Sequence, residues 1–250
     1  MIIGYGTIDE VIQSGTDLAI LSVGSIEQHG PHLPVTTDWE IATALGEGIA
    51  EITGGFYVPA FPVSTNREHM GKRGSAVGMS PNIFYDMMWD ICVNLKNQGF
   101  KKIAIIPAHG GIFIMNPLVR ELNATFQPDL MVAKLDCNDI WQEFFTEGIL
   151  ESKTELHSGE GETSLMLHIN PQSVHMDKAI DWIPENAQQS DLNYGSIHRY
   201  CPDGVWGNAK CATAEKGKKM LDYMIAGLIK QMERAFSIME GKQQIGNSWF

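Results

Sequence analysis

The sequence has little positive charge and no long apolar run. Lys and Arg total 18 residues against 30 Asp and Glu, giving a formal net charge of −12 at pH 7. A surface of that sign repels phosphate backbones and anionic lipid, so we expect no nucleic-acid or membrane partner. No apolar run approaches the ~20 residues that cross a bilayer, and the opening MIIGYG lacks the basic and apolar stretches of a signal peptide. These absences predict a cytoplasmic protein.

Cysteine is also scarce. The four cysteines are Cys92, Cys137, Cys201 and Cys211, which are widely spaced and form no CxxC pair. This spacing excludes a disulfide framework of closely set cysteines, and we expect four thiols that pack as small apolar side chains. A chain of this size buries roughly 70–75% of the surface of its unfolded form, so stability alone requires no metal or disulfide.

Short apolar segments alternate with longer helical patterns. We expect strands at 17–23, 56–60, 102–107 and 130–135, and helices at 39–52, 81–98, 112–126 and 213–240. This alternation predicts an α/β fold with a mainly parallel β-sheet flanked by helices on both faces. We expect a single domain over residues 1–240 and a polar C-terminal tail over 241–250. Two long excursions, 63–80 and 169–211, interrupt the alternation and are typical of site-forming loops.

Three residues with metal-binding chemistry follow the first strand. Glu27 and His29 are two residues apart, so in extended backbone their side chains point to the same side. Asp38 follows after a turn-rich connection. Two carboxylates and an imidazole at a strand end form a ligand set suited to Zn²⁺ or Mn²⁺. The alternatives are that Asp38 caps the next helix and that the other two are solvated loop residues.

A fourth candidate follows the strand at 102–107. His109 precedes Gly110 and Gly111 and lies at the same edge of the predicted sheet, so it is the expected fourth ligand. The alternative is an ordinary turn residue. Asp136, at the end of the next strand, is expected to cap a helix that begins near Asn138.

A third group stands at the start of a helix. His157 lies close to Glu160 and Glu162, and an imidazole near carboxylates is a common proton shuttle. Either glutamate could complete a second metal site. The alternative is that both carboxylates only complement the helix dipole.

Together these motifs resemble the creatininase (creatinine amidohydrolase) family. They are EQHGPHLP at 27–34 with TD at 37–38, HGG at 109–111, HSGEGETS at 157–164 and ATAEKG at 212–217. They occur in the family's order from about residue 15 to 230. The resemblance implies a creatininase-like three-layer sandwich, two ions of Zn²⁺ and/or Mn²⁺ per subunit, and a homo-oligomer, often a hexamer.

The resemblance also implies roles for individual residues. Metal ligands would be Glu27, His29, His109 and Asp38, the last as the bridging carboxylate, with His157 and Glu162 acting in proton transfer. The chain would be a metal-dependent amidohydrolase in which a hydroxide between the metals attacks the carbonyl of a small cyclic polar substrate and breaks a C–N bond. Related enzymes open keto-inositol rings, deformylate formamides or trim peptides. A metal-poor protein that binds a small ligand is the non-enzyme alternative.

The chain departs from the family at several positions. Creatininase proper has a metal-binding glutamate where this chain has Gly111, so Glu160 or Glu162 would serve the second metal instead. The segment after Glu68-His69 lacks the aromatic residue and proline usual in relatives. Its Lys72 and Arg73 could face a polar or anionic substrate, and together with Gly111 they argue against creatinine itself; the alternative is a solvated basic edge. In the later loops, Trp182 and Trp206 are candidate walls for a small ring, with ordinary packing as the alternative.

Overall fold

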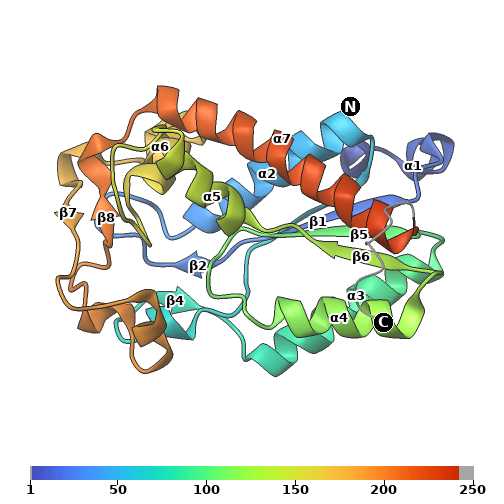
Figure 1. The fold of residues 1–250 in the computed structure, drawn as a ribbon, viewed down its shortest axis with the longest axis horizontal. Helices are drawn as coiled ribbons and strands as arrows, with labels where there is room; N and C mark the ends of the chain where they lie inside the picture. The colour runs from blue at the N-terminus through green and yellow to red at the C-terminus, as the bar shows by residue number, and fades with distance from the viewer. Residues whose placement is uncertain (1, 242–250) are drawn as a thin grey trace, which may run out of the picture.

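A four-stranded parallel sheet forms the centre of the computed structural model, which describes residues 2–241 (Figure 1). Its strands lie in the order β3-β1-β5-β6 and all neighbours run parallel. Their bounds are β1 Leu18–Val23, β3 Phe56–Phe61, β5 Lys102–Pro107 and β6 Met131–Lys134. The four predicted strands are therefore confirmed, with ends that differ by at most one residue. Of the predicted tail at 241–250, all but Gly241 lies outside the described residues.

Helices cover both faces of this sheet. The crossovers between its strands are α2 Thr37–Thr53, α3 Pro81–Asn97 and α4 Met115–Phe126; the other long helices are α5 Cys137–Thr146, α6 Glu160–Ile169 and α7 Ala214–Met239. Figure 1 shows α3 and α4 below the sheet and α2, α5, α6 and α7 above it. The predicted α/β fold with helices on both faces is confirmed.

Alternation along the strands explains the two helical layers. In β1, Ile20 packs in the core beneath α2 and α7, whereas Leu21 packs in the core against α3 and α4. Both side chains are fully buried. Burial of such a side chain stabilises the fold by about 1.5–3 kcal/mol, and strands buried on both faces need apolar residues at successive positions.

Short elements occupy the two predicted excursions. Strand β4 Ala76–Val77 pairs antiparallel with β2 Ile26–Glu27, and β7 Asp181–Trp182 pairs antiparallel with β8 Gly207–Asn208. The remaining elements are α1 Ile8–Ser14 and the 3₁₀ helices η1 Ile3–Tyr5, η2 Arg67–His69, η3 Pro171–Ser173, η4 Met176–Lys178, η5 Gln189–Asn193, η6 Ile197–Arg199 and η7 Ala209–Cys211. The pairing of β2 with β4 brings the loop at 63–80 against the segment that carries Glu27.

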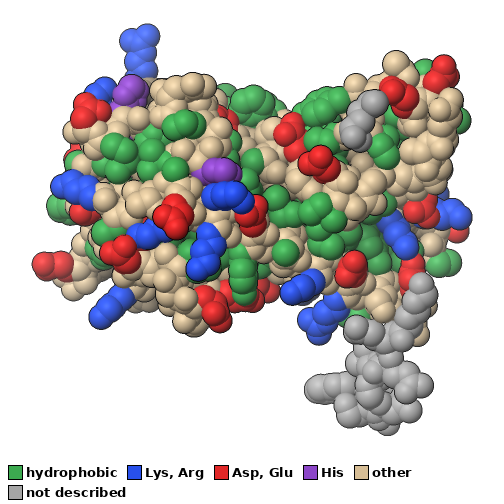
Figure 2. Space-filling model, turned by 90° about the horizontal axis from the view of Figure 1, so that it is seen from above, with side chains coloured by type: hydrophobic (Ala, Val, Ile, Leu, Met, Phe, Trp, Pro, Cys, Tyr) green, Lys and Arg blue, Asp and Glu red, His purple; other side chains and the backbone are tan. Residues whose placement is uncertain are grey.

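All four cysteines are free thiols. Within residues 2–241, no helix is long and apolar enough to cross a membrane. On the face drawn in Figure 2, Lys and Arg side chains are interspersed with Asp and Glu side chains.

Helices α6 and α7 approach each other closely at Gly217. A Cβ atom at this position would overlap the backbone carbonyl of Ser164 in α6. We expect Gly217→Ala to force the two helices apart and lower the free energy of unfolding by about 2 kcal/mol, as overpacking of a core does. Urea unfolding measures this change. An unaltered midpoint in the variant would contradict the close packing.

Candidate metal centre

The carboxyl ends of β1 and β5 bring four of the predicted ligands together. Glu27 ends β2, just beyond β1, and His29 follows it; Asp38 lies in the first turn of α2, and His109 follows β5. His29 Nε2 lies 3.2 Å from Asp38 Oδ1. His109 Nδ1 lies 3.2 Å from both Asp38 Oδ2 and Glu27 Oε1. The two oxygens of Asp38 thus face two different imidazoles.

The chemistry of this cluster fits divalent cations. Glu27 and His29 are fully buried, Asp38 is 1% exposed and His109 is 7% exposed. Among the described residues, Glu27 Oε1, His29 Nε2 and Asp38 Oδ2 make no well-directed hydrogen bond. Buried polar atoms without partners are costly, and cations bound among these residues would satisfy them. Two candidate ligand sets share Asp38: one adds Glu27 and His109, and the other adds His29 and Glu162.

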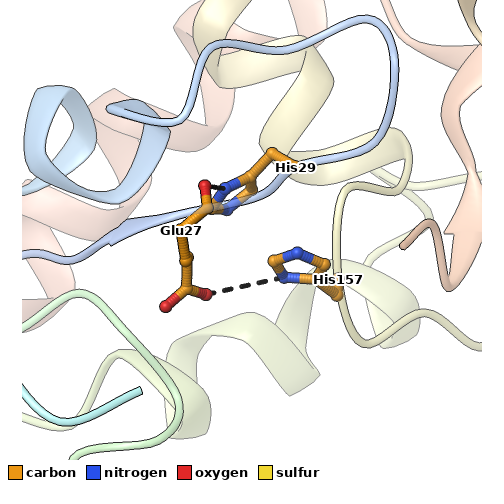
Figure 3. Close-up of side chains that lie close together, drawn as sticks. All are labelled: Glu27, His29 and His157. Carbon is orange, nitrogen blue, oxygen red and sulfur yellow. Dashed lines mark hydrogen bonds and ion pairs between the residues drawn. The ribbon is translucent and has the colours of Figure 1, made fainter. Parts of the chain in front are cut away.

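The backbone fixes the proton on His29. Its Nδ1 lies 3.1 Å from the carbonyl oxygen of Glu27, which can only accept a hydrogen bond, so Nδ1 donates and Nε2 faces the cluster (Figure 3). Burial lowers the pKa of His29, but the charges of Asp38 and Glu162 outweigh it and raise the pKa to about 10. The surrounding carboxylates therefore create a potential that favours positive charge at this position.

His157 faces the same cluster from the opposite side. In Figure 3 its ring and the carboxylate of Glu27 point toward each other, with 4.0 Å between His157 Nδ1 and Glu27 Oε1. Its Nε2 lies 2.6 Å from the backbone carbonyl oxygen of Gln28, to which it donates. Burial and the charge of His29 hold the pKa of His157 well below its usual range. The ring is therefore neutral, with the lone pair of Nδ1 directed at the site.

Glu162 completes one ligand set from the first turn of α6. Its Oε2 lies 3.7 Å from His29 Nε2 and accepts a hydrogen bond of 2.5 Å from the backbone of Ser158. Burial and the charge of Asp38 raise the pKa of Glu162 to about 7, against the opposing effect of His29. A carboxyl group with this pKa exchanges a proton readily near neutral pH.

The structure adds two residues to which the sequence assigned no role. His69 in η2 is buried, and its Nε2 lies 3.1 Å from Glu27 Oε1, while the amide nitrogen of Gln28 lies 3.2 Å from His69 Nδ1. Its neighbour Glu68 lies 3.2 Å from His109 Nε2. The sequence shows that Glu68 and His69 are neighbours in a loop. A loop has no strand or helix periodicity, so the sequence does not predict which way their side chains point.

Glu160 requires a correction, because the structure does not bring it to this cluster. Its carboxylate lies 2.5 Å from Lys216 Nζ and accepts 2.7 Å hydrogen bonds from the backbone and hydroxyl of Ser152. Glu160 and Glu162 are about 200° apart around α6, so only one of them can face the cluster. Glu160 therefore ties α6 to α7.

The four predicted substrate-binding residues also lie elsewhere. Lys72 donates to the carbonyl of Pro202, Arg73 is exposed, and Trp182 donates from its indole to the carbonyl of Tyr200. Trp206 is buried, and its backbone pairs with that of His157, so it helps to fix the backbone that carries this imidazole. Within residues 2–241, none of these four lines either of the two cavities beside the cluster.

The larger of these cavities, about 640 Å³, opens onto the cluster through His109, His157 and Glu162. Its cationic side chain outside the imidazoles is Arg67. The apolar part of the wall is formed by Phe113, Ile114, Pro117, Leu156, Leu192 and Ile197. The second cavity, about 390 Å³, shares His109, His157 and Glu162 with the first.

A parallel α/β sheet with buried carboxylates and imidazoles at its carboxyl edge, beside a cavity, is the architecture of a metal-dependent hydrolase. The family model described as "Creatininase: Creatinine amidohydrolase" matches residues 5–232. The chain belongs to the creatininase family, and its relatives are metal-dependent amidohydrolases and other hydrolases. The resemblance seen in the sequence motifs is confirmed.

Named relatives have different substrates. The chain is 28% identical over 245 residues to a 3-dehydro-scyllo-inosose hydrolase of Thermotoga maritima, covering 87% of this chain and 78% of the relative. It is 25% identical over 240 residues to a creatinine amidohydrolase of Pseudomonas putida, covering 90% and 92%. A solved creatininase variant has a TM-score of 0.75 at 25% identity, covering 94% of this chain and 98% of that one. The chain shares its family and fold with these relatives, whereas the substrates in the relatives' names differ from one another.

Proposed function

We propose that this protein hydrolyses the C–N bond of a small amide with two divalent cations bound at Asp38. The observation that carries this proposal is the pair of ligand sets that share Asp38 at the edge of a cavity. Zinc and manganese forms of creatininase are among the solved structures with this fold, and both metals suit carboxylate and imidazole ligands. When bound, such ions polarise a carbonyl and lower the pKa of water from 15.7 to about 7.

The protein's own groups would then bind the substrate and move protons. His157 presents the lone pair of Nδ1 toward the cluster, so it can take a proton there and return it to the departing nitrogen. Glu162 would serve as a carboxylate ligand of the second cation, which would keep it ionised. Burial of the carboxylates and imidazoles of the cluster would strengthen the electrostatic interactions at the reacting carbonyl.

The wall of the larger cavity combines apolar and polar side chains. Phe113, Ile114 and Leu192 suit an apolar substituent, while Arg67 and Asn193 offer hydrogen-bond partners to a polar group. We therefore propose an amide or formamide that carries an apolar group as substrate, and we expect poor activity on creatinine.

A substrate screen of the metal-loaded protein tests this function. Cyclic ureides, lactams, N-acyl amides, formamides and keto-inositols would be compared at equal concentration. We expect turnover on the order of 10 s⁻¹ for one amide class and release of ammonia or an amine. Efficient ring opening of a keto-inositol with no amide hydrolysis would contradict the C–N assignment. Tight binding of a ring compound by metal-free protein without turnover would favour a binding protein.

We further propose a cytoplasmic homo-oligomer, a hexamer on the family resemblance, built from the single domain predicted over 1–240. Light scattering coupled to size exclusion tests the assembly. A mass close to the 27.7 kDa of one chain would contradict it.

A further inference from the structure

We propose that Glu68 is a positioning residue that holds His109 in the orientation needed for metal binding. This inference rests on the proposed function, because it concerns the same metal centre. The structure assigns the two nitrogens of His109 opposite tasks: Nδ1 faces Glu27 and Asp38, and Nε2 faces Glu68.

Carboxylates face both nitrogens of His109, so a bound cation would decide where its proton lies. A cation held by Glu27 and Asp38 would take the lone pair of Nδ1, which leaves the proton of a neutral His109 on Nε2. Nε2 lies 3.2 Å from Glu68 Oε1, a contact without good hydrogen-bond direction in this structure, and an ionised carboxylate there can accept that proton's hydrogen bond. The side chains of His109 and Glu68 are 5% and 15% exposed, so little water competes for this contact. A carboxylate behind a metal-binding histidine fixes its tautomer and increases its basicity.

Gly111 makes room for this contact. A Cβ atom at position 111 would overlap both Glu68 Oε1 and His109 Nε2. The hydroxyl of Thr65 donates to the carbonyl of Gly111 at 3.1 Å and so ties the loop that carries Glu68 to the turn after β5. The glutamate expected at 111 from creatininase proper is thus replaced by glycine, and a carboxylate from another loop occupies that space.

Two other imidazoles at the cluster, those of His29 and His157, rest on neutral acceptors. His29 donates to the carbonyl of Glu27, and His157 donates to the carbonyl of Gln28. Among these three rings, only His109 has a carboxylate behind it. Removal of the Glu68 carboxylate should therefore weaken metal binding without removing a metal ligand.

Zinc affinity of the metal-free protein tests the inference. We expect Glu68→Ala to lower the affinity for Zn²⁺ about 10–100-fold, measured by competition with a chromophoric chelator. Glu68→Gln should lose less, because its amide oxygen still accepts the hydrogen bond but carries no charge. The melting temperature of both metal-free variants should stay near that of the parent. Glu233→Ala, at an exposed site on α7, is the matched control and should bind zinc unchanged.

The outcomes separate this inference from the proposed function. If Glu68→Ala binds zinc as tightly as the parent while Asp38→Ala does not, the positioning role fails and the proposed metal centre stands. If both Glu68 variants lose equal affinity together with a fall in metal-free melting temperature, the residue is structural and the inference is overturned. If the parent itself binds no divalent metal, both proposals fail.

Discussion

Asp38→Ala should remove both metal and activity. Asp38 is the residue shared by the two ligand sets, and its two oxygens lie 3.2 Å from His29 and from His109. Its loss takes a charged ligand from each set, so we expect the metal content after dialysis to fall close to zero. We expect kcat/KM to fall at least about a thousandfold, which corresponds to about 4 kcal/mol of transition-state stabilisation. Elemental analysis and steady-state kinetics on the same sample measure both effects.

Glu40→Gln is the matched control for this substitution. Glu40 lies in the same first turn of α2, where it bonds to Thr36 and Asn170 and takes no part in the cluster. If Asp38 served only the start of the helix, as the sequence also allowed, the two variants would lose similar stability and keep their metal. Retention of metal and turnover by Asp38→Ala would contradict the assignment of the site.

Lys216→Met should destabilise the fold strongly while the metal ligands remain in place. Lys216 Nζ lies 2.5 Å from Glu160 Oε1, and Glu160 is fully buried. The substitution leaves a buried carboxylate without its cation, which costs 3–5 kcal/mol when a buried pair is broken. Because the side chain of Lys216 is 18% exposed, we expect about 3 kcal/mol, or a fall in melting temperature of roughly 6–12 °C.

An exposed ion pair on the same helix provides the comparison. The side chains of Lys218 and Asp222 are 63% and 62% exposed, with 2.6 Å between nitrogen and oxygen. Lys218→Met should change stability by less than about 0.5 kcal/mol. Addition of Glu160→Gln to Lys216→Met should recover part of the loss, because the unpaired charge is removed. Equal effects of the two lysine substitutions would contradict a structural role for the buried pair.

The sequence predicts the sheet and the convergence of four candidate ligands for one physical reason. Strands buried on both faces need apolar residues at successive positions, which makes segments such as KIAIIP at 102–107 conspicuous. The carboxyl ends of parallel strands meet at one edge, so polar residues that follow β1 and β5 converge without any knowledge of side-chain contacts. The structure brings Glu27, His29, Asp38 and His109 together there.

Helix rotation and loop paths explain what the sequence could not give. Whether Glu160 or Glu162 faces the cluster depends on how α6 packs on α7, which Gly217 and Lys216 determine from a distant part of the chain. The loop at 63–80 has no periodic pattern that indicates where its side chains point. Glu68 reaches the site there, whereas Lys72 bonds to the carbonyl of Pro202 instead.

Anomalous diffraction from crystals grown with Zn²⁺ or Mn²⁺ tests the central claim most directly. We expect two peaks, each about 2.0–2.2 Å from an oxygen of Asp38, one beside Glu27 and His109 and the other beside His29 and Glu162. A single peak would reduce the site to one ion. Metal absent from Asp38, or bound only at other residues of the chain, would contradict the account.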